Sequence, residues 1–523
     1  MADATDTDRP SVRRWQPLEL NVRVPAEVIA GVGNPYVELA VDVEWTHRPS
    51  GRTLSRPAFW DGVGFRVRFA SAEAEGVWTW AARINGGLTN VGGEVEVIDG
   101  EPVDAFERHG PLRMSDDGRS VVHHDGCSFL VVADTPWALP FRATPQTCRV
   151  YAADRQAKGF NAALLMVVQP DMRAEGPTDR TADAGFGRAF ADLPAGRLTQ
   201  PLPDYFDTLD QLLDILLARG IVPVFQPVFQ GFGWKGQGVA GNVVPQEDYA
   251  RFCRYLVARY GHRPAVWLVG GDGSGDEPQV PAGGAMIHAV DAFAQPTGIH
   301  YGPNQLPDAH HTADWLDFQW CQTGHAGHHL PDRVRWLWDR TPAKACANGE
   351  PTYERPDRGA GMWQAHEAWS NLCAGGTMGV VYGAMSLWQW RHHRDEPGWP
   401  ENFTAPGCGW RDALDFPGST HVGNVARILG GYDTTGLAPD WTFTWGRPGL
   451  LNPRRLAVVY LHDGGGDQVL LGDVPREYTV FRTSDAEPVA RGRLDAHPAT
   501  PPYPAFETPA GPHVVVFGTP RAG

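Results

Sequence analysis

FLVVADTPWALPFRATPQTCRVYAADRQAKGFNAALLMVV, residues 129–168, contains two short apolar runs on either side of a segment with helical character. The runs, residues 129–137 and 160–168, are rich in Val, Leu and Ala, which is typical of strands buried on both faces of a parallel sheet. Residues 144–158 between them predict a helix. A strand, a helix and a second buried strand in this order predict a βαβ unit.

The same alternation continues along the middle of the chain. Residues 204–220 carry apolar side chains at three- and four-residue spacing and predict a helix that is capped by Asp204 and ends at Gly220. Six further apolar runs predict strands at residues 221–229, 265–272, 298–304, 316–325, 344–354 and 376–390. Eight strands with helical or crossover segments between most of them predict an α/β protein with a (β/α)8 TIM barrel. An open doubly wound sheet is the alternative, but no GxGxxG follows the first strand to support it.

Both ends of the chain have a different pattern. Apolar and polar residues alternate at period two in residues 36–45, 64–70, 76–84 and 93–100, and again in 454–471, 477–483 and 513–518. The Gly-rich residues 463–468 predict a hairpin turn. At 523 residues the chain exceeds what one core usually supports. We therefore expect an N-terminal β-sandwich at 1–107, the barrel at 108–438 and a C-terminal β-sandwich at 439–523.

Charge and composition restrict the partners. The net charge of -16 leaves no basic surface for phosphates, so we expect no nucleic-acid partner. No run of about 18 apolar residues is present, so we expect no membrane span. The polar start predicts a cytoplasmic protein. None of the seven cysteines forms a CxxC pair, which indicates reduced thiols. The oligomeric state is not predicted.

Active sites of (β/α)8 barrels lie at the carboxyl ends of the strands. The predicted strands end in acids, amides and aromatic residues, with little positive charge: Asp134, Trp137, Gln226, Asp272, Trp320, Gln322, His325, Glu350, Tyr353 and Trp388. Paired carboxylates among amides and indoles suit glycosidic bond cleavage, and Asp272 and Glu350 are the candidate pair. Taken singly, Asp272 could equally be a turn or cap residue and Glu350 a buried ion-pair partner. The other candidates would bind the sugar.

The two-carboxylate chemistry needs neither a cofactor nor a metal. His325 to His329, HAGHH, is the most metal-like cluster in the sequence, but no carboxylate or cysteine stands at ligand spacing with it. We expect a polar loop there, or a sugar contact through His325. If the carboxyls lie roughly 5–5.5 Å apart the anomeric configuration is retained, and about 6.5–9.5 Å predicts inversion.

Residues 109–168, together with VWLVGGDG at 266–273 and GEPTYE at 349–354, resemble the apiosidase-like barrel family, once called DUF4038. The preceding sandwich is similar to the DUF5060 domain, and the tail resembles a β-sandwich that carries a collagen-binding label. The resemblance implies a retaining glycoside hydrolase, with Asp272 as acid/base, Glu350 as nucleophile and Asp134 on the sugar of the first subsite. It also favours a terminal pentofuranose such as apiose or arabinose, in a small glycoside or oligosaccharide.

One position departs from the wider clan of such barrels, which usually carries Asn-Glu after the fourth strand. Here Gly271 and Asp272 stand in that place, a change shared by the apiosidase-like branch. The shorter Asp must lie closer to the glycosidic oxygen to protonate it. Two alternatives are a carbohydrate-binding protein whose barrel has lost catalysis, and an adhesion protein suggested only by the label of the tail.

Overall fold

The computed structural model describes residues 9–172, 185–231, 238–303, 305, 307–324, 331–355, 361–392, 408–471, 476–495 and 505–521. Its centre is an eight-stranded sheet in the order β17-β16-β15-β14-β13-β12-β11-β18, in which neighbouring strands run parallel. The strands are β11 (Val131–Asp134), β12 (Ala162–Met166), β13 (Val222–Gln226), β14 (Val266–Gly273), β15 (Thr297–Tyr301), β16 (Phe318–Gln322), β17 (Ala345–Glu350) and β18 (Gly379–Tyr382). Each lies within a predicted run or one residue beyond it.

The sheet curls into a nearly closed barrel. β18 pairs with β11, with Tyr382 beside Asp134. Just beyond the ends of β17 and β18, a parallel bridge joins Glu354 to Ala384, and the Glu354 amide donates to the Gly383 carbonyl at 2.8 Å. The predicted (β/α)8 fold is confirmed, and the open doubly wound alternative is wrong because the first and last strands pair.

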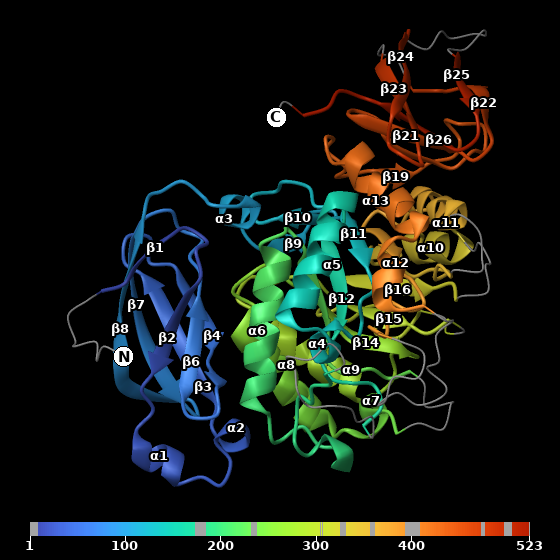
Figure 1. Cartoon of the computed structure of the whole chain (residues 1–523). Coiled ribbons are helices and arrows are strands. Elements are labelled where there is room, and N and C mark those ends of the chain that lie inside the picture. Colours follow the sequence, from blue (N-terminus) through green and yellow to red (C-terminus); the bar gives the residue numbers. More distant parts are fainter. Residues whose placement is uncertain are drawn as a thin grey trace.

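Helices surround the strands (Figure 1). They are α4 (Leu139–Arg142), α5 (Pro145–Lys158), α6 (Pro203–Leu217), α7 (Ala240–Val243), α8 (Gln246–Tyr260), α9 (Gln279–Val290), α10 (Pro331–Trp338), α11 (Met362–Cys373), α12 (Trp410–Leu414) and α13 (Pro417–Leu429), with one 3-10 turn, η1 (Leu193–Ala195). The predicted Asp204 cap is wrong. α6 begins at Pro203, because proline is favourable in a first turn, and Asp204 lies inside that turn.

The N-terminal region packs two antiparallel sheets against each other, with one parallel edge strand (Figure 1, blue). Trp45 stacks on Phe69 at a ring distance of 4.1 Å in its core. The elements are β1 (Ser11–Arg13), β2 (Leu18–Val22), α1 (Ala26–Ala30), α2 (Pro35–Glu38), β3 (Val41–His47), β4 (Thr53–Pro57), β5 (Phe59–Trp60), β6 (Phe65–Phe69), β7 (Gly76–Ile84) and β8 (Gly87–Ile98). α3 (Ala105–His109), β9 (Leu112–Met114) and β10 (Val121–His123) lead into the barrel.

The N-terminal sandwich docks on the barrel through the buried Arg56 and the half-buried Arg68. The Arg56 guanidinium donates to the carbonyls of Gly261 and Val257, which lie at the end of α8. Arg68 pairs with Asp210 of α6 at 2.5 Å. Because these donors are shielded from water, each contact is worth more than a surface ion pair. The sandwich is thereby held against α6 and α8.

The C-terminal region forms a six-stranded sheet in the order β19-β20-β21-β26-β23-β24 and a separate pair, β22-β25. The bounds are β19 (Ala438–Pro439), β20 (Gly449–Asn452), β21 (Leu456–Leu461), β22 (Gly464–Gln468), β23 (Arg476–Arg482), β24 (Pro488–Leu494), β25 (Ala505–Ala510) and β26 (His513–Phe517). The hairpin turn predicted at 463–468 is wrong, because Gly464–Gln468 is itself a strand whose backbone pairs with β25. Backbone pairing of this kind needs no side-chain pattern.

In the parts of the chain that the structure describes, no helix has both the length and the apolar character that crossing a bilayer requires. The cytoplasmic location and the lack of a nucleic-acid partner stay predictions.

Candidate active site

A bulge in β17 decides which way Glu350 points. Cys321 of β16 pairs with Asn348, but the next residue, Gln322, pairs with Glu350, so Gly349 is an extra residue. Cys346 and Asn348 face the outer helices, where the side-chain amide group of Asn348 lies 3.3 Å from Glu367 of α11. Strict alternation would turn Glu350 outward with them, whereas the inserted residue moves it to the inner face that Gln322 occupies.

Two side chains hold the Glu350 carboxylate, and a third supports one of them. His300 at the end of β15 places Nε2 3.4 Å from Glu350 Oε2. The Tyr353 hydroxyl donates to the Glu350 side chain and accepts a hydrogen bond of 2.8 Å from Trp137 Nε1. Burial, followed by the charge of Glu350, raises the pKa of Tyr353 well above its ordinary value, so the phenol keeps its proton. Glu350 itself is 8% exposed and therefore still reaches the barrel mouth.

Replacing Tyr353 by phenylalanine tests this support. The variant removes a donor to a carboxylate, a hydrogen bond worth about 1.5–3 kcal/mol. If that bond strengthens as Glu350 develops its reacting geometry, kcat should fall about 10- to 100-fold with little change in KM. Steady-state kinetics on an aryl glycoside measures it, with Tyr478→Phe in the C-terminal sandwich as the control. A lower Tm with unchanged kcat would assign Tyr353 a structural role only.

Asp272 occupies a constrained position at the end of β14. The pairing of β14 with β15 skips Asp272, since Gly271 pairs with His300 and Gly273 with Tyr301. Asp272 has a φ of 59°, in the left-handed region that few non-glycine residues adopt. Such strain is concentrated at functional sites, where the surrounding structure maintains it. Here the backbone conformation aims a half-buried carboxyl away from the regular strand direction.

The loop after β13 fixes this conformation. The Gln230 amide donates to the Gly271 carbonyl at 3.0 Å, and Gln230 Oε1 accepts from the Gly271 amide at 2.7 Å. Gly231 lies directly against the Asp272 side chain, and a Cβ at Gly231 would stand 2.2 Å from Asp272 Oδ2. A glycine at position 231 is therefore required for the observed place of the carboxyl.

Gly231→Ala should displace Asp272 without removing it. A shift of about 1 Å can cost roughly 10²-fold when a group must reach a reacting atom. We expect that loss in kcat/KM for glycosides with a poor leaving group, which needs a proton, and little loss for dinitrophenyl glycosides, which do not. Gly64→Ala is the matched control, because a Cβ there meets nothing within 4 Å. An equal loss on both substrates would contradict the positioning role.

His300 lies next to both candidate acids. Its backbone pairs with Gly271, the residue before Asp272, and its ring approaches Glu350. Asp272 and Glu350 therefore both lie at the carboxyl ends of strands of the same barrel, on either side of β15 and β16. His300 was not among the predicted site residues, although its place at the end of the fifth predicted strand was a usable signal.

Two predicted amides also lie at this end of the barrel. Gln226 has no exposed surface, and a Cβ at Gly271 would stand 1.1 Å from its Nε2, so its side chain crosses directly over that glycine. Within the described ranges neither amide atom of Gln226 has a hydrogen-bond partner, nor does Gln322 Oε1. Buried polar groups without partners are costly. Gln322, which is 4% exposed, thus offers an acceptor for a hydroxyl group of a ligand, whereas the fully buried Gln226 does not reach one and its predicted sugar contact does not hold.

Asp134 does not have the geometry of a sugar contact. Its side chain is fully buried between the barrel and α5, where it accepts from Arg155 Nε at 2.5 Å and from the Tyr151 hydroxyl at 3.0 Å. Burial by itself lowers the pKa of Arg155. The negative charge of the nearby Asp134 acts in the opposite direction, and the pKa of Arg155 lies above its ordinary value. The pair joins β11 to α5, and the predicted sugar contact is replaced by a structural role.

The predicted aromatic residues divide into three cases. Trp320 has no exposed surface and its Nε1 donates to Met378 Sδ at 3.0 Å, so it fills the barrel core and the predicted sugar contact does not hold. Trp137 is 2% exposed and contributes through its bond to Tyr353. Trp388 is half-buried after β18 and stays a candidate. His325 lies outside the described residues.

The prediction that no metal is bound can be compared with the structure only for the described residues. Among these residues no group of three or more His, Cys, Asp or Glu side chains is arranged to hold a metal ion. His325–His329 lies outside them.

Comparisons with known proteins identify the family of the barrel and of the N-terminal region. The family described as "Apiosidase-like, catalytic domain" matches residues 115–435, and the domain of unknown function DUF5060 matches residues 11–85. No curated protein matches this chain.

Solved structures with similar folds include two from Bacteroides vulgatus ATCC 8482. A candidate glycoside hydrolase has a TM-score of 0.69 at 14% identity, over 97% of this chain and 99% of its own. A glycoside hydrolase of family 5 has a TM-score of 0.62 at 19% identity, over 79% of this chain and 94% of its own. At these identities the likeness shows the fold.

Proposed function

Because this chain belongs to the apiosidase-like family and is a glycoside hydrolase, we propose that it is a retaining enzyme that releases a terminal pentofuranose from a small glycoside or oligosaccharide. The favoured sugar is of the apiose or arabinose type. The observation that carries the proposal is the Glu350 carboxylate, turned into the barrel mouth by the β17 bulge and held by His300 and Tyr353, with Asp272 fixed at the end of β14.

In the first step Asp272 donates its proton to the glycosidic oxygen while a Glu350 oxygen attacks the anomeric carbon. The bond to the leaving group breaks, the aglycone departs as an alcohol, and the sugar is esterified to Glu350. The hydrogen bond from Tyr353 orients the attacking carboxylate. Gln322 binds a hydroxyl group of the sugar and so helps to hold the ring in reach of both acids.

In the second step Asp272, now ionised, takes a proton from water as the water attacks the anomeric carbon. The bond to Glu350 breaks and the sugar leaves with its original configuration. Two displacements on opposite faces account for retention. All proton transfers use side chains of this chain, so no cofactor takes part in the proposed steps.

A panel of 4-nitrophenyl glycosides tests the substrate and the stereochemistry. We expect the highest kcat/KM among apiofuranosides and arabinofuranosides of both anomers, compared with xylopyranosides and glucopyranosides. Proton NMR of the first-formed sugar should show the anomer of the substrate. Preference for a hexopyranoside would reject the pentofuranose, and an opposite first anomer would reject the double displacement. A protein that binds these sugars and hydrolyses none would support the binding-protein alternative.

A further inference from the structure

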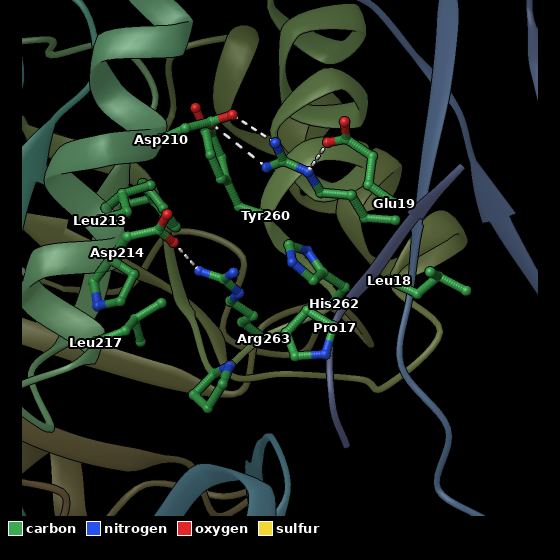
Figure 2. A pocket seen from close by; sticks show the side chains of 14 residues that line it. Pro17, Leu18, Glu19, Asp210, Leu213, Asp214, Leu217, Tyr260, His262 and Arg263 are labelled. Atoms are coloured by element: carbon green, nitrogen blue, oxygen red, sulfur yellow. Dashed lines mark hydrogen bonds and ion pairs between the residues drawn. The ribbon is translucent and has the colours of Figure 1, made fainter. Parts of the chain in front are cut away.

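A cavity lies between the N-terminal sandwich and the barrel (Figure 2). Its volume is about 310 Å³, and its walls come from β2, from α6 and from the segment between α8 and β14. Pro264 lies two residues before the first residue of β14, so the cavity lies at the amino ends of the barrel strands. Glu350 and Asp272 lie at the carboxyl ends. The cavity is therefore separate from the candidate active site.

An adjoining cavity of about 300 Å³ extends this space along the same junction. Pro17, Asp214, Leu217, His262, Arg263 and Pro264 line both cavities. The second cavity adds Trp15 and the half-buried Phe106. We call the two together the junction groove. Volumes of roughly 300–1,000 Å³ are typical of small-molecule sites.

The groove contains buried polar groups whose hydrogen-bonding capacity the protein uses only in part, although the His262 ring also meets the backbone of Arg259. His262 is 4% exposed and Tyr260 is 5% exposed. Neither His262 Nδ1 nor the Tyr260 hydroxyl has a hydrogen-bond partner in the portion of the chain that is described. Figure 2 shows the His262 ring in the middle of the cavity, between Tyr260 and Pro17. Burial lowers the pKa of His262 well below its ordinary value, so the ring is neutral.

The charged groups of the groove compensate one another. Arg68 pairs with Glu19 at 2.8 Å and with Asp210 at 2.5 Å, and Arg263 pairs with Asp214. These interactions are the dashed lines of Figure 2. In the adjoining cavity Glu107 pairs with Arg13 at 3.0 Å, and Asp104 accepts a hydrogen bond from the Glu107 amide as the cap of α3. Among the described residues the groove therefore presents no unpaired cation to select a small anion. A ligand that matches it is neutral and supplies both donors and acceptors.

We propose that the junction groove binds a short neutral oligosaccharide. Hydroxyl groups would satisfy His262 and Tyr260, and the C–H faces of the sugar rings would pack on Leu213, Leu217 and Pro264. Two adjoining cavities suit a chain of sugars better than a single ring. This site would retain an oligosaccharide on the enzyme at a place remote from the catalytic acids, and it does not depend on which sugar the active site cleaves.

Calorimetric titration tests the site with cellotriose, xylotriose, arabinotriose and maltotriose as probes. Glu350→Gln serves as the background, because it prevents turnover during the titration. Leu217→Trp fills the groove from α6, and Leu18→Trp fills it from the sandwich. Leu88→Trp is the matched control, since Leu88 is 66% exposed and does not line the groove.

For at least one probe we expect a binding component whose Kd rises about tenfold or more in Leu217→Trp and in Leu18→Trp and stays unchanged in Leu88→Trp. If one filling variant does not fold, the other decides. The proposal is overturned if no probe gives such a component, or if sodium sulfate competes with it. If the protein binds an oligosaccharide in the junction groove but hydrolyses no aryl glycoside, the hydrolytic proposal is refuted and the proposed binding site is retained.

Discussion

Glu350→Ala should reduce hydrolysis of 4-nitrophenyl pentofuranosides by roughly 10⁴- to 10⁶-fold, the scale seen when an enzyme loses its nucleophile. The variant removes the atom that forms the covalent intermediate, so neither displacement can proceed. Glu350→Gln keeps the shape and should be equally inactive, because an amide does not attack an anomeric carbon. Initial rates measure both, with Glu507→Gln, an exposed site on β25, as the control.

Azide distinguishes the nucleophile from a residue that only supports the fold. In Glu350→Ala the space left by the side chain admits a small anion on the face that Glu350 attacks. We expect azide to restore part of the rate on dinitrophenyl glycosides and to yield a glycosyl azide of inverted configuration. No rescue, in a variant whose Tm matches the parent, would remove Glu350 from the nucleophile role.

Asp272→Ala should slow hydrolysis of glycosides with poor leaving groups by about 10²- to 10⁴-fold, the usual contribution of a general acid–base group. Dinitrophenyl glycosides leave without protonation, so their first step should be nearly unaffected. Their second step lacks a base, so the glycosyl enzyme should accumulate and give a burst of phenol. Stopped-flow absorbance measures the burst.

The same variant gives the opposite azide product. With Glu350 intact, azide attacks the glycosyl enzyme on the face normally used by water, so the glycosyl azide should have the configuration of the substrate. Asp276→Asn is the control, because Asp276 is exposed four residues along the chain. An equal loss on poor and good leaving groups would show that Asp272 is not the acid.

Several elements of this protein follow from local sequence. Apolar runs such as 160–168 and 221–229 became β12 and β13, because continuous Val, Leu and Ala residues are stable only where both faces of a strand are covered. The period-two segments at the two ends became sandwiches for the corresponding reason. The candidate acids were found because strand ends in a parallel barrel all meet at one rim.

The errors at the candidate site have one physical origin, the direction in which a side chain points. Asp134 and Glu350 are both acids at strand ends, yet Asp134 packs outward on Arg155 and Glu350 faces the mouth. Trp320 has the composition of a sugar platform but lies in the core. No local pattern separates these cases, because a one-residue bulge such as that at Gly349 reverses the face of every later residue.

The sequence by itself therefore determined the order of strands and helices, the flanking sandwiches and the family, all of which depend on short-range periodicity and recognisable motifs. Only the tertiary structure decided which groups meet: Trp137 bonds to Tyr353 across 216 residues, and Gly231 makes room for Asp272. The junction groove belongs to this second class as well. Its walls come from the N-terminal sandwich and from the barrel, and contact between distant segments is settled by packing, which no local segment of the chain encodes alone.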